Sequence, residues 1–268
     1  MRASTVRFGP HRIAAWSMGQ GPGLLLVHGT PFSAHVWHRI TPHLAPHFTV
    51  HSFDLLGYGQ SDMPDADVSL GVQNGVLGAV MDHFGLNRPS VIAHDFGGAT
   101  ALRAHLRDGR DYARLLLIDP VAIRPWGSPF VAHVRRHEAA FAGLPPYIHA
   151  AILAAYLRGA SHRGLTDTGL TPYLDPWTGA KGQEAFYRQI AQMDPVHTDE
   201  IEPLLGTVRC PVRLLWGVRD DWIPLADGRR LAAMLPDCPL TEVAGAGHLM
   251  QEDAPEAIVG AALEFLRH

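Results

Sequence analysis

The chain has 268 residues, 47% of them hydrophobic, which is enough to bury one α/β core together with an insertion. Its formal net charge of −4 gives no field that would attract nucleic acid or an anionic membrane surface. No apolar run is long enough to span a membrane, and residues 1–6 lack the apolar region of a signal peptide. We therefore expect a soluble, cytoplasmic protein, as a monomer or homodimer.

The first half of the chain alternates short apolar runs with longer segments of helical pattern. These elements, in chain order, are strand 23–27, helix 34–44, strand 48–53, helix 70–84, strand 90–93, helix 97–107 and strand 113–118. Strands that alternate with helices imply a parallel sheet covered on both faces. The sequence thus predicts an α/β fold.

The alternation stops after Asp119-Pro120, and no strand-like run occurs from 121 to about 194. Helices are predicted inside this stretch at 130–141, 147–158 and 183–193. The strand and helix pattern then returns as strand 211–216, helix 225–235, strand 239–243 and helix 254–266. We expect a core domain formed by residues 1–120 and 195–268, with residues 121–194 inserted as a helical cap.

Asp95 lies in a turn between the predicted strand 90–93 and the helix that follows it. The surrounding sequence, Ala93-His94-Asp95-Phe96-Gly97, has the spacing small-x-nucleophile-x-Gly of a strand-to-helix elbow. A serine at this position attacks carbonyl carbon. A carboxylate attacks saturated carbon and leaves an alkyl ester on the protein. The sequence therefore predicts Asp95 as the nucleophile, although an aspartate here can also be a simple helix cap.

An acid and a histidine follow two later strands. Asp220 comes after strand 211–216, and His248 follows strand 239–243 in the turn Gly245-Ala246-Gly247. Parallel strands bring these loops to the same edge of the sheet as Asp95. The chain order of nucleophile, acid and histidine is that of the α/β-hydrolase fold. Asp221 and, more remotely, Asp119 are alternative acids, and Asp220 can also be read as an ordinary turn residue.

The turn His28-Gly29-Thr30-Pro31 ends the predicted strand 23–27. The backbone N–H groups of Thr30 and Phe96 are predicted to point at one place and form an oxyanion hole. We interpret His28, like Asp54 in the segment 54–61, as a structural residue rather than a proton carrier.

Taken together, these motifs resemble the α/β-hydrolase fold, in its branch of epoxide hydrolases and haloalkane dehalogenases, over nearly the whole chain. The segments that carry the resemblance are 28–31, 57–61, 94–98, the loop around Asp220, and Gly247-His248. The resemblance implies an Asp-His-Asp triad and a small apolar substrate, with no metal or organic cofactor.

The two chemistries of this branch differ in how the leaving group is stabilised. Epoxide hydrolases of the family use two cap tyrosines, whereas dehalogenases usually use a tryptophan directly after the nucleophile together with an asparagine or tryptophan elsewhere. Here Phe96 follows Asp95, and Thr30 stands where an asparagine would be expected. Tyr187, in Phe186-Tyr187-Arg188-Gln189, resembles the second cap tyrosine, and either Tyr147 or Tyr156 is the first.

We therefore expect an epoxide hydrolase that opens an apolar epoxide to a diol. The first alternative is a haloalkane dehalogenase with the same triad, which Trp126 and Trp177 in the insertion keep open. The second is a non-hydrolytic member of the fold that binds a ligand or acts as a lyase.

Overall fold

The computed structural model describes residues 1–267, and its strands form a single sheet in the order β1-β2-β4-β3-β5-β6-β7-β8. The neighbours from β4 to β8 pair in parallel, while β2 runs antiparallel to both β1 and β4. The strands span β1 Arg2–Phe8, β2 His11–Met18, β3 Gly23–Val27, β4 Thr49–Phe53, β5 Ser90–His94, β6 Leu115–Ile118, β7 Val212–Gly217 and β8 Leu240–Val243.

The central strands β3, β5 and β6 are buried on both faces, which explains why they appear in the sequence as continuous apolar runs. Leu26 pairs with Ile92, which pairs in turn with Leu116. The antiparallel strands β1 and β2 were not expected. Their exposed positions carry polar and charged side chains, so they lack the apolar run by which the central strands are recognised.

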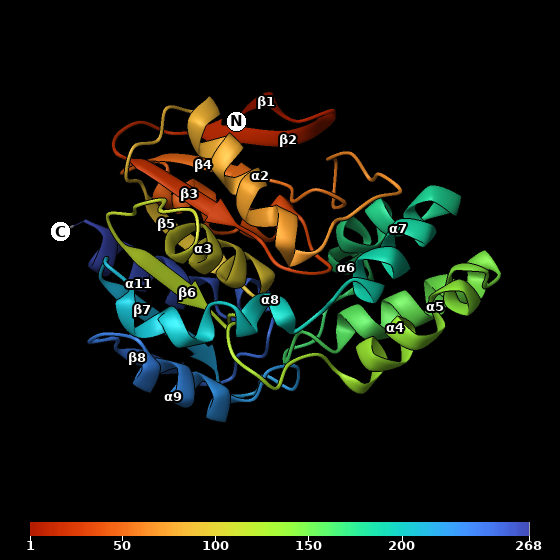
Figure 1. Ribbon diagram of the computed structural model, residues 1–268. Helices are drawn as coiled ribbons and strands as arrows, with labels where there is room; N and C mark the ends of the chain where they lie inside the picture. Colours follow the sequence, from red (N-terminus) through yellow and green to blue (C-terminus); the bar gives the residue numbers. More distant parts are fainter. Residues whose placement is uncertain (268) are drawn as a thin grey trace.

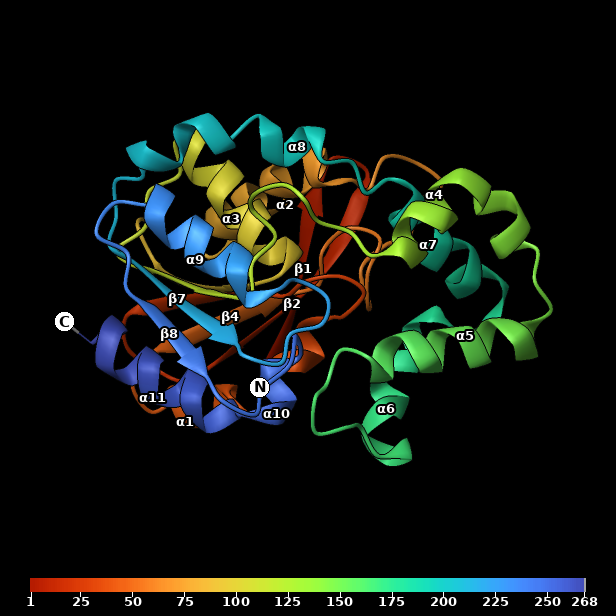
Figure 2. The same cartoon turned by 90° about the horizontal axis from the view of Figure 1, so that it is seen from below.

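Helices cover both faces of the sheet (Figure 2). On one face lie α2 (Leu70–His83), α3 (Phe96–Leu106) and α9 (Leu225–Met234), and on the other α1 (Thr41–Leu44) and α11 (Pro255–Leu266). The predicted α/β fold with a helical insertion is thereby confirmed.

The prediction of a single helix at 34–44 is wrong in detail. The chain instead forms a 3-10 helix, η1 (Ala34–Trp37), followed by the separate short helix α1. Pro42 lies in the first turn of α1 and has no N–H to donate to a preceding turn, so the helix has to begin anew there.

Residues 121–194, which make up most of the segment between β6 and β7, are largely helical and gather on one side of the molecule, as Figure 1 shows. We call residues 121–194 the cap. Its helices are α4 (Pro129–Ala142), α5 (Pro146–Arg158), α6 (Asp167–Leu174), η2 (Asp175–Trp177) and α7 (Gly179–Ala191). Helix α6 was not expected, because Gly169 and Pro172 interrupt its pattern. Three short helices, α8 (Val196–Asp199), η3 (Glu202–Thr207) and α10 (Met250–Asp253), complete the chain.

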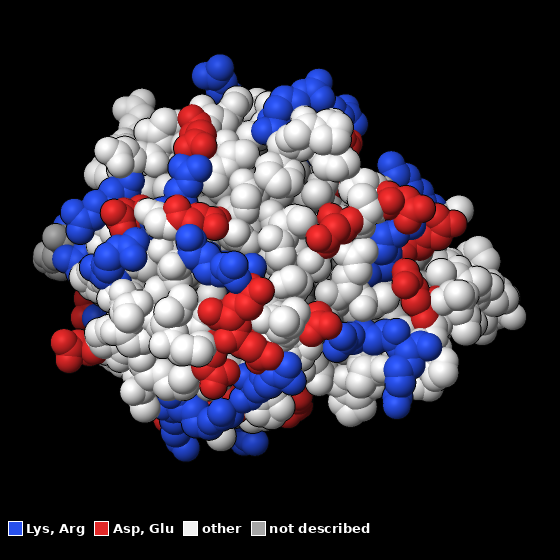
Figure 3. Space-filling model, in the orientation of Figure 1, with Lys and Arg blue, Asp and Glu red and all other residues white. Residues whose placement is uncertain are grey.

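Acidic and basic side chains are interspersed on the face shown in Figure 3. Ion pairs also join acidic and basic side chains of the described chain, for example Arg103 with Glu200 at 2.7 Å and Arg135 with Asp194 at 3.1 Å. This face therefore offers no broad patch of one charge. Among residues 1–267, none of the helices has the length and apolar character that a bilayer crossing requires.

Candidate active site

Asp95 lies at the junction of β5 and α3 in a conformation that aspartate rarely adopts, with φ 51° and ψ −120°. The turn is tight on both sides. A Cβ atom on Gly97 would approach the carbonyl oxygen of Val27 to 2.3 Å, and one on Gly29 would lie 2.4 Å from the Asp95 side chain. The glycines therefore allow a strained elbow that presents the carboxylate at the carboxyl edge of the sheet.

Asp95, His248 and Asp220 come together in a buried chain of polar contacts. His248 Nδ1 lies 2.8 Å from Asp220 Oδ2, and His248 Nε2 lies 3.4 Å from Asp95 Oδ2. The backbone N–H groups of Trp222 and Ile223 donate to Asp220 Oδ1, both at 2.8 Å. Since Asp220 is an acceptor, His248 carries a proton on Nδ1 and turns Nε2 toward Asp95.

The pKa of His248 is held well above its usual value. Burial by itself lowers this pKa, but the carboxylates of Asp220 and Asp95 together outweigh burial. In this state His248 is an imidazolium between two carboxylates. Loss of the Asp95 charge would remove one of the two causes and lower the pKa again.

The two alternative acids do not occupy this place. Asp221 is exposed. Asp119 is buried and accepts a hydrogen bond from the Gly217 N–H at 2.7 Å, and its pKa is raised well above normal, by burial first and then by the charge of Asp220. Asp119 therefore acts as a structural residue at the end of β6, and Asp220 is the acid that touches His248.

The Thr30 N–H donates to Asp95 Oδ1 at 2.7 Å, as predicted for one half of the oxyanion hole. The second predicted donor, the Phe96 amide, belongs to the first turn of α3, where N–H groups have no partner within the helix. The Thr30 amide stabilises negative charge on Asp95 Oδ1 directly, and the positive end of α3, where the Phe96 amide lies, favours negative charge at the same place.

Two residues that the sequence did not single out hold the His248 loop. His94 donates from Nε2 to the His248 carbonyl oxygen at 2.9 Å; burial lowers its pKa to about 3, so the ring stays neutral. Asp253 accepts hydrogen bonds from the N–H of Gly247 at 2.8 Å and from Ser161 Oγ, in the loop after α5, at 2.6 Å. Asp253 thus links the loop of His248 to the cap.

Of the three candidate tyrosines, Tyr156 is the one the structure brings to Asp95. It comes from α5 and lines a small cavity together with Asp95, Phe96 and Trp222. Its ring stacks on Trp222, with centroids 4.5 Å apart. Within the described chain its hydroxyl has no hydrogen-bond partner. Burial, and next the negative charge of Asp95, raises the pKa of this hydroxyl, so it remains a proton donor.

The structure does not bring Tyr187 or Tyr147 to the site. Tyr187 is buried, but its hydroxyl donates to His149 Nδ1 at 3.0 Å inside the cap. Two residues later on the same helix, Gln189 faces the core, and a spacing of two puts Tyr187 on nearly the opposite side of α7. Tyr147 is 74% exposed at the start of α5. Of the tyrosines predicted as proton donors, Tyr156 therefore lines the cavity beside Asp95, and Tyr147 and Tyr187 do not.

The two cap tryptophans that favoured the halide alternative donate elsewhere. Trp126 Nε1 binds Thr198 Oγ1 at 2.8 Å, and Trp177 Nε1 binds the Pro31 carbonyl oxygen at 2.7 Å. Trp222 lines the cavity, but its ring lies flat against His248 and Tyr156 and so shields the base from water.

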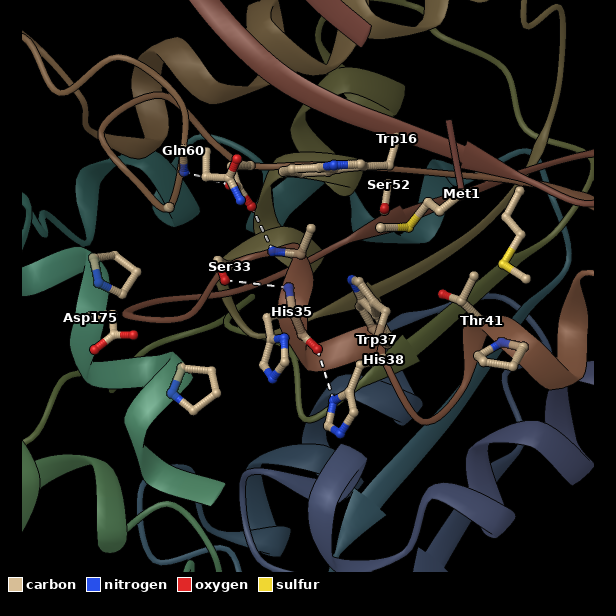
Figure 4. A pocket seen from close by; sticks show the side chains of 17 residues that line it. Met1, Trp16, Ser33, His35, Trp37, His38, Thr41, Ser52, Gln60 and Asp175 are labelled. Atoms are coloured by element: carbon tan, nitrogen blue, oxygen red, sulfur yellow. Dashed lines mark hydrogen bonds between the residues drawn. The ribbon is translucent and has the colours of Figure 1, made fainter. Parts of the chain in front are cut away.

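The cavity beside Asp95 has a volume of about 30 Å³, enough for one or two water molecules. A separate hollow of about 650 Å³ lies between the cap, β2 and η1, where Trp16, Trp37 and His35 line it (Figure 4). No triad member borders that hollow. In the described part of the chain, no three His, Cys, Asp or Glu side chains converge in a way that would hold a metal ion.

His28 is structural, as predicted. The Leu55 N–H donates to its Nε2 at 2.9 Å, and its Nδ1 donates to the Gly29 carbonyl oxygen at 2.9 Å. Burial lowers the pKa of His28 to about 4, against 6.5 for an ordinary histidine.

This lowered pKa predicts an acid-sensitive contribution to stability. The unfolded chain takes up the proton first as the pH falls, so the contribution is full above pH 6.5 and is lost as the pH falls toward 4. His28→Asn should therefore lose about 2 kcal/mol less unfolding free energy than the unmodified protein between pH 7.5 and 5.0. Urea titrations at both pH values measure this difference, and equal losses in the two proteins would contradict it.

The parallel sheet, the strained elbow and the polar triad at its carboxyl edge define an α/β hydrolase. The model of the alpha/beta hydrolase family matches residues 24–261, so the chain belongs to this family. An α/β hydrolase fold protein from Burkholderia ambifaria is 54% identical, with 97% of each chain covered and a TM-score of 0.96.

The curated relatives of the chain include haloalkane dehalogenases. Haloalkane dehalogenase 2 of Mycobacterium tuberculosis is 27% identical over 260 residues, which cover 92% of this chain and 88% of the relative. The haloalkane dehalogenase of Mesorhizobium japonicum is 27% identical over 263 residues, with 92% and 84% covered. The chain is thus an α/β hydrolase that is similar in sequence to haloalkane dehalogenases.

Proposed function

We propose that the protein hydrolyses a small apolar substrate through an alkyl ester on Asp95. The observation that carries the proposal is the position of Asp95 between His248 Nε2, 3.4 Å from Oδ2, and the Thr30 N–H, 2.7 Å from Oδ1. The Asp95 carboxyl group thus has a base on one side and a hydrogen-bond donor on the other.

In the first step Asp95 Oδ2 attacks a saturated carbon, and the carbon–leaving-group bond breaks. The ester that forms carries no charge, so His248 loses one of the two carboxylates that hold its pKa high. His248 can then release its Nε2 proton to solvent and act as a base. It takes a proton from water, whose oxygen attacks the Asp95 carbonyl carbon. The tetrahedral intermediate then collapses: the bond to the alkyl oxygen breaks, His248 returns the proton to that oxygen, and free Asp95 and the alcohol product are left.

Tyr156 favours an epoxide as the substrate. An opening epoxide leaves an alkoxide, which needs a proton donor. Tyr156 lines the cavity, and its hydroxyl has no hydrogen-bond partner among the described residues. The indole N–H groups of Trp126 and Trp177, which a departing halide would use, are both occupied. Because the cavity holds only one or two waters, residues 121–194, the proposed cap domain, must move to admit the substrate.

The substrate proposal predicts a specific effect of Tyr156→Phe. Loss of the hydroxyl should lower kcat/KM for styrene oxide by a factor on the order of 10² to 10⁴, the range of a lost general acid. Tyr147→Phe, at an exposed position of the same helix, is the matched control and should leave the rate unchanged. Rates measured by diol formation test this. Equal loss in both variants, or in neither, would count against the role of Tyr156.

Haloalkane hydrolysis is the second candidate, because two curated relatives carry the name haloalkane dehalogenase. It uses the same Asp95 ester but needs no proton for the leaving group. Halide release from a panel of bromoalkanes, together with no turnover of styrene oxide, would establish it in place of the epoxide reaction. Under that outcome Tyr156→Phe should have little effect.

A further inference from the structure

Gln189 connects the cap to the turn that holds Asp95. It lies on α7, is 2% exposed, and its Oε1 accepts two hydrogen bonds from core residues. Thr30 Oγ1 donates to it at 2.7 Å and the Tyr58 hydroxyl at 2.9 Å. Gln189 therefore holds the side chain of the very residue whose N–H donates to Asp95.

A second hydrogen bond also joins the turn 29–32 to the cap. Its own backbone supplies one hydrogen bond, from the Phe32 N–H to the Gly29 carbonyl oxygen at 3.0 Å. The cap supplies the contact from Gln189 to Thr30 and another from Trp177 Nε1 to the Pro31 carbonyl oxygen, at 2.7 Å. Two consecutive residues of the turn are thus bonded to cap elements η2 and α7.

Burial of the Gln189 amide has a cost, since its Nε2 is buried without a hydrogen-bond partner among the described residues. Its neighbours on the buried side of α7, Phe186 and Ile190, are apolar, and a methionine would fill the same space without this cost. The contribution of the amide is therefore that its oxygen accepts hydrogen bonds from two hydroxyl groups, those of Thr30 and Tyr58.

We propose that Gln189 is a positioning residue for the hydrolysis of the Asp95 ester. By fixing the Thr30 side chain it aims the Thr30 N–H at Oδ1, the oxygen that becomes negative when water adds to the ester carbonyl. The effect is selective for this step, because ester formation consumes the negative charge of Asp95 and creates no oxyanion on Asp95 Oδ1. The inference rests on the proposed alkyl-ester reaction.

The test compares Gln189→Met with Gln192→Met. Gln192, near the end of the same helix, also joins cap to core: it accepts from the Val68 N–H at 2.7 Å and donates to the Ala66 carbonyl oxygen at 3.0 Å, but it does not contact the turn. Rapid-quench mass spectrometry of the Asp95 peptide, with styrene oxide and 1-bromobutane as probes, gives the rates of ester formation and decay separately.

Gln189→Met should slow ester decay about 10-fold, less than the 10²- to 10³-fold loss of a whole oxyanion donor, with formation changed less than about two-fold. Gln192→Met should change neither rate. Thr30→Val removes the other end of the same hydrogen bond and keeps the N–H, so it should slow decay similarly. The double variant should be no slower than either single one.

Several outcomes would overturn the proposal: unchanged ester decay in Gln189→Met, equal effects in Gln189→Met and Gln192→Met, or additive effects of Gln189→Met and Thr30→Val. If Gln189→Met does not fold, Thr30→Val provides the test. The ratio of its rate of ester decay to its rate of ester formation should be lower than in the unmodified protein. Absence of any ester in the unmodified protein and in His248→Gln would overturn the proposed function, and this inference with it. If the ester forms but decays equally fast in Gln189→Met and in the unmodified protein, only the inference about Gln189 would be overturned.

Discussion

Asp95→Ala should abolish turnover, with kcat reduced by a factor on the order of 10⁴ to 10⁶, as for removal of a nucleophile in other hydrolases. The reason is that neither neighbouring carboxylate can take its place: Asp220 contacts His248 Nδ1, and Asp119 is buried and accepts a hydrogen bond from the Gly217 N–H. Turnover of styrene oxide and bromoalkanes by purified protein measures the loss.

The matched control is Asp221→Ala, which removes an exposed carboxylate beside Asp220 and should leave turnover within about two-fold. Melting curves of both variants show whether either has lost its fold. If Asp95→Ala retained the activity of the unmodified protein, Asp95 would not be the nucleophile. If it bound ligand with unchanged affinity and neither form turned over substrate, the non-hydrolytic alternative would hold.

His248→Gln should stop the reaction after the first step. Ester formation does not need His248, whereas hydrolysis of the ester needs a base, so the ester should accumulate while multiple turnover falls by ~10⁴-fold or more. The protein mass after incubation with substrate should rise by the mass of the alkyl group on the peptide that contains Asp95.

His162→Gln, which changes an exposed histidine, serves as the control and should neither accumulate ester nor lose turnover. An unmodified mass in inactive His248→Gln would mean that the histidine acts before or without a covalent intermediate. Full turnover by His248→Gln would remove it from the mechanism altogether.

The core could be predicted from the sequence because its elements obey local rules. The buried runs of β3, β5 and β6 and the glycine at position 97 are visible without tertiary information. Parallel strands end at one edge, so Asp95, Asp220 and His248 could be grouped before any distance was known. The structure brings these three side chains together.

The cap was less predictable, because which way a side chain points depends on packing between helices. Phe186-Tyr187-Arg188-Gln189 was interpreted through Tyr187, whereas Gln189 is the residue of this segment that reaches the core. One signal was available: Gln189 is the polar member of a buried row that includes Phe186, Ile190 and Met193. Nothing local distinguished Tyr156 from Tyr147.

Single-turnover hydrolysis in ¹⁸O-labelled water is the most direct test of the proposed ester. Excess protein is mixed with styrene oxide or 1-bromobutane, whichever it turns over, and the Asp95 peptide and the product are analysed by mass spectrometry. Because water attacks the Asp95 carbonyl, the label should enter the Asp95 carboxylate, and the first product should carry an unlabelled oxygen from Asp95. Label found in the product and absent from Asp95 would contradict the account.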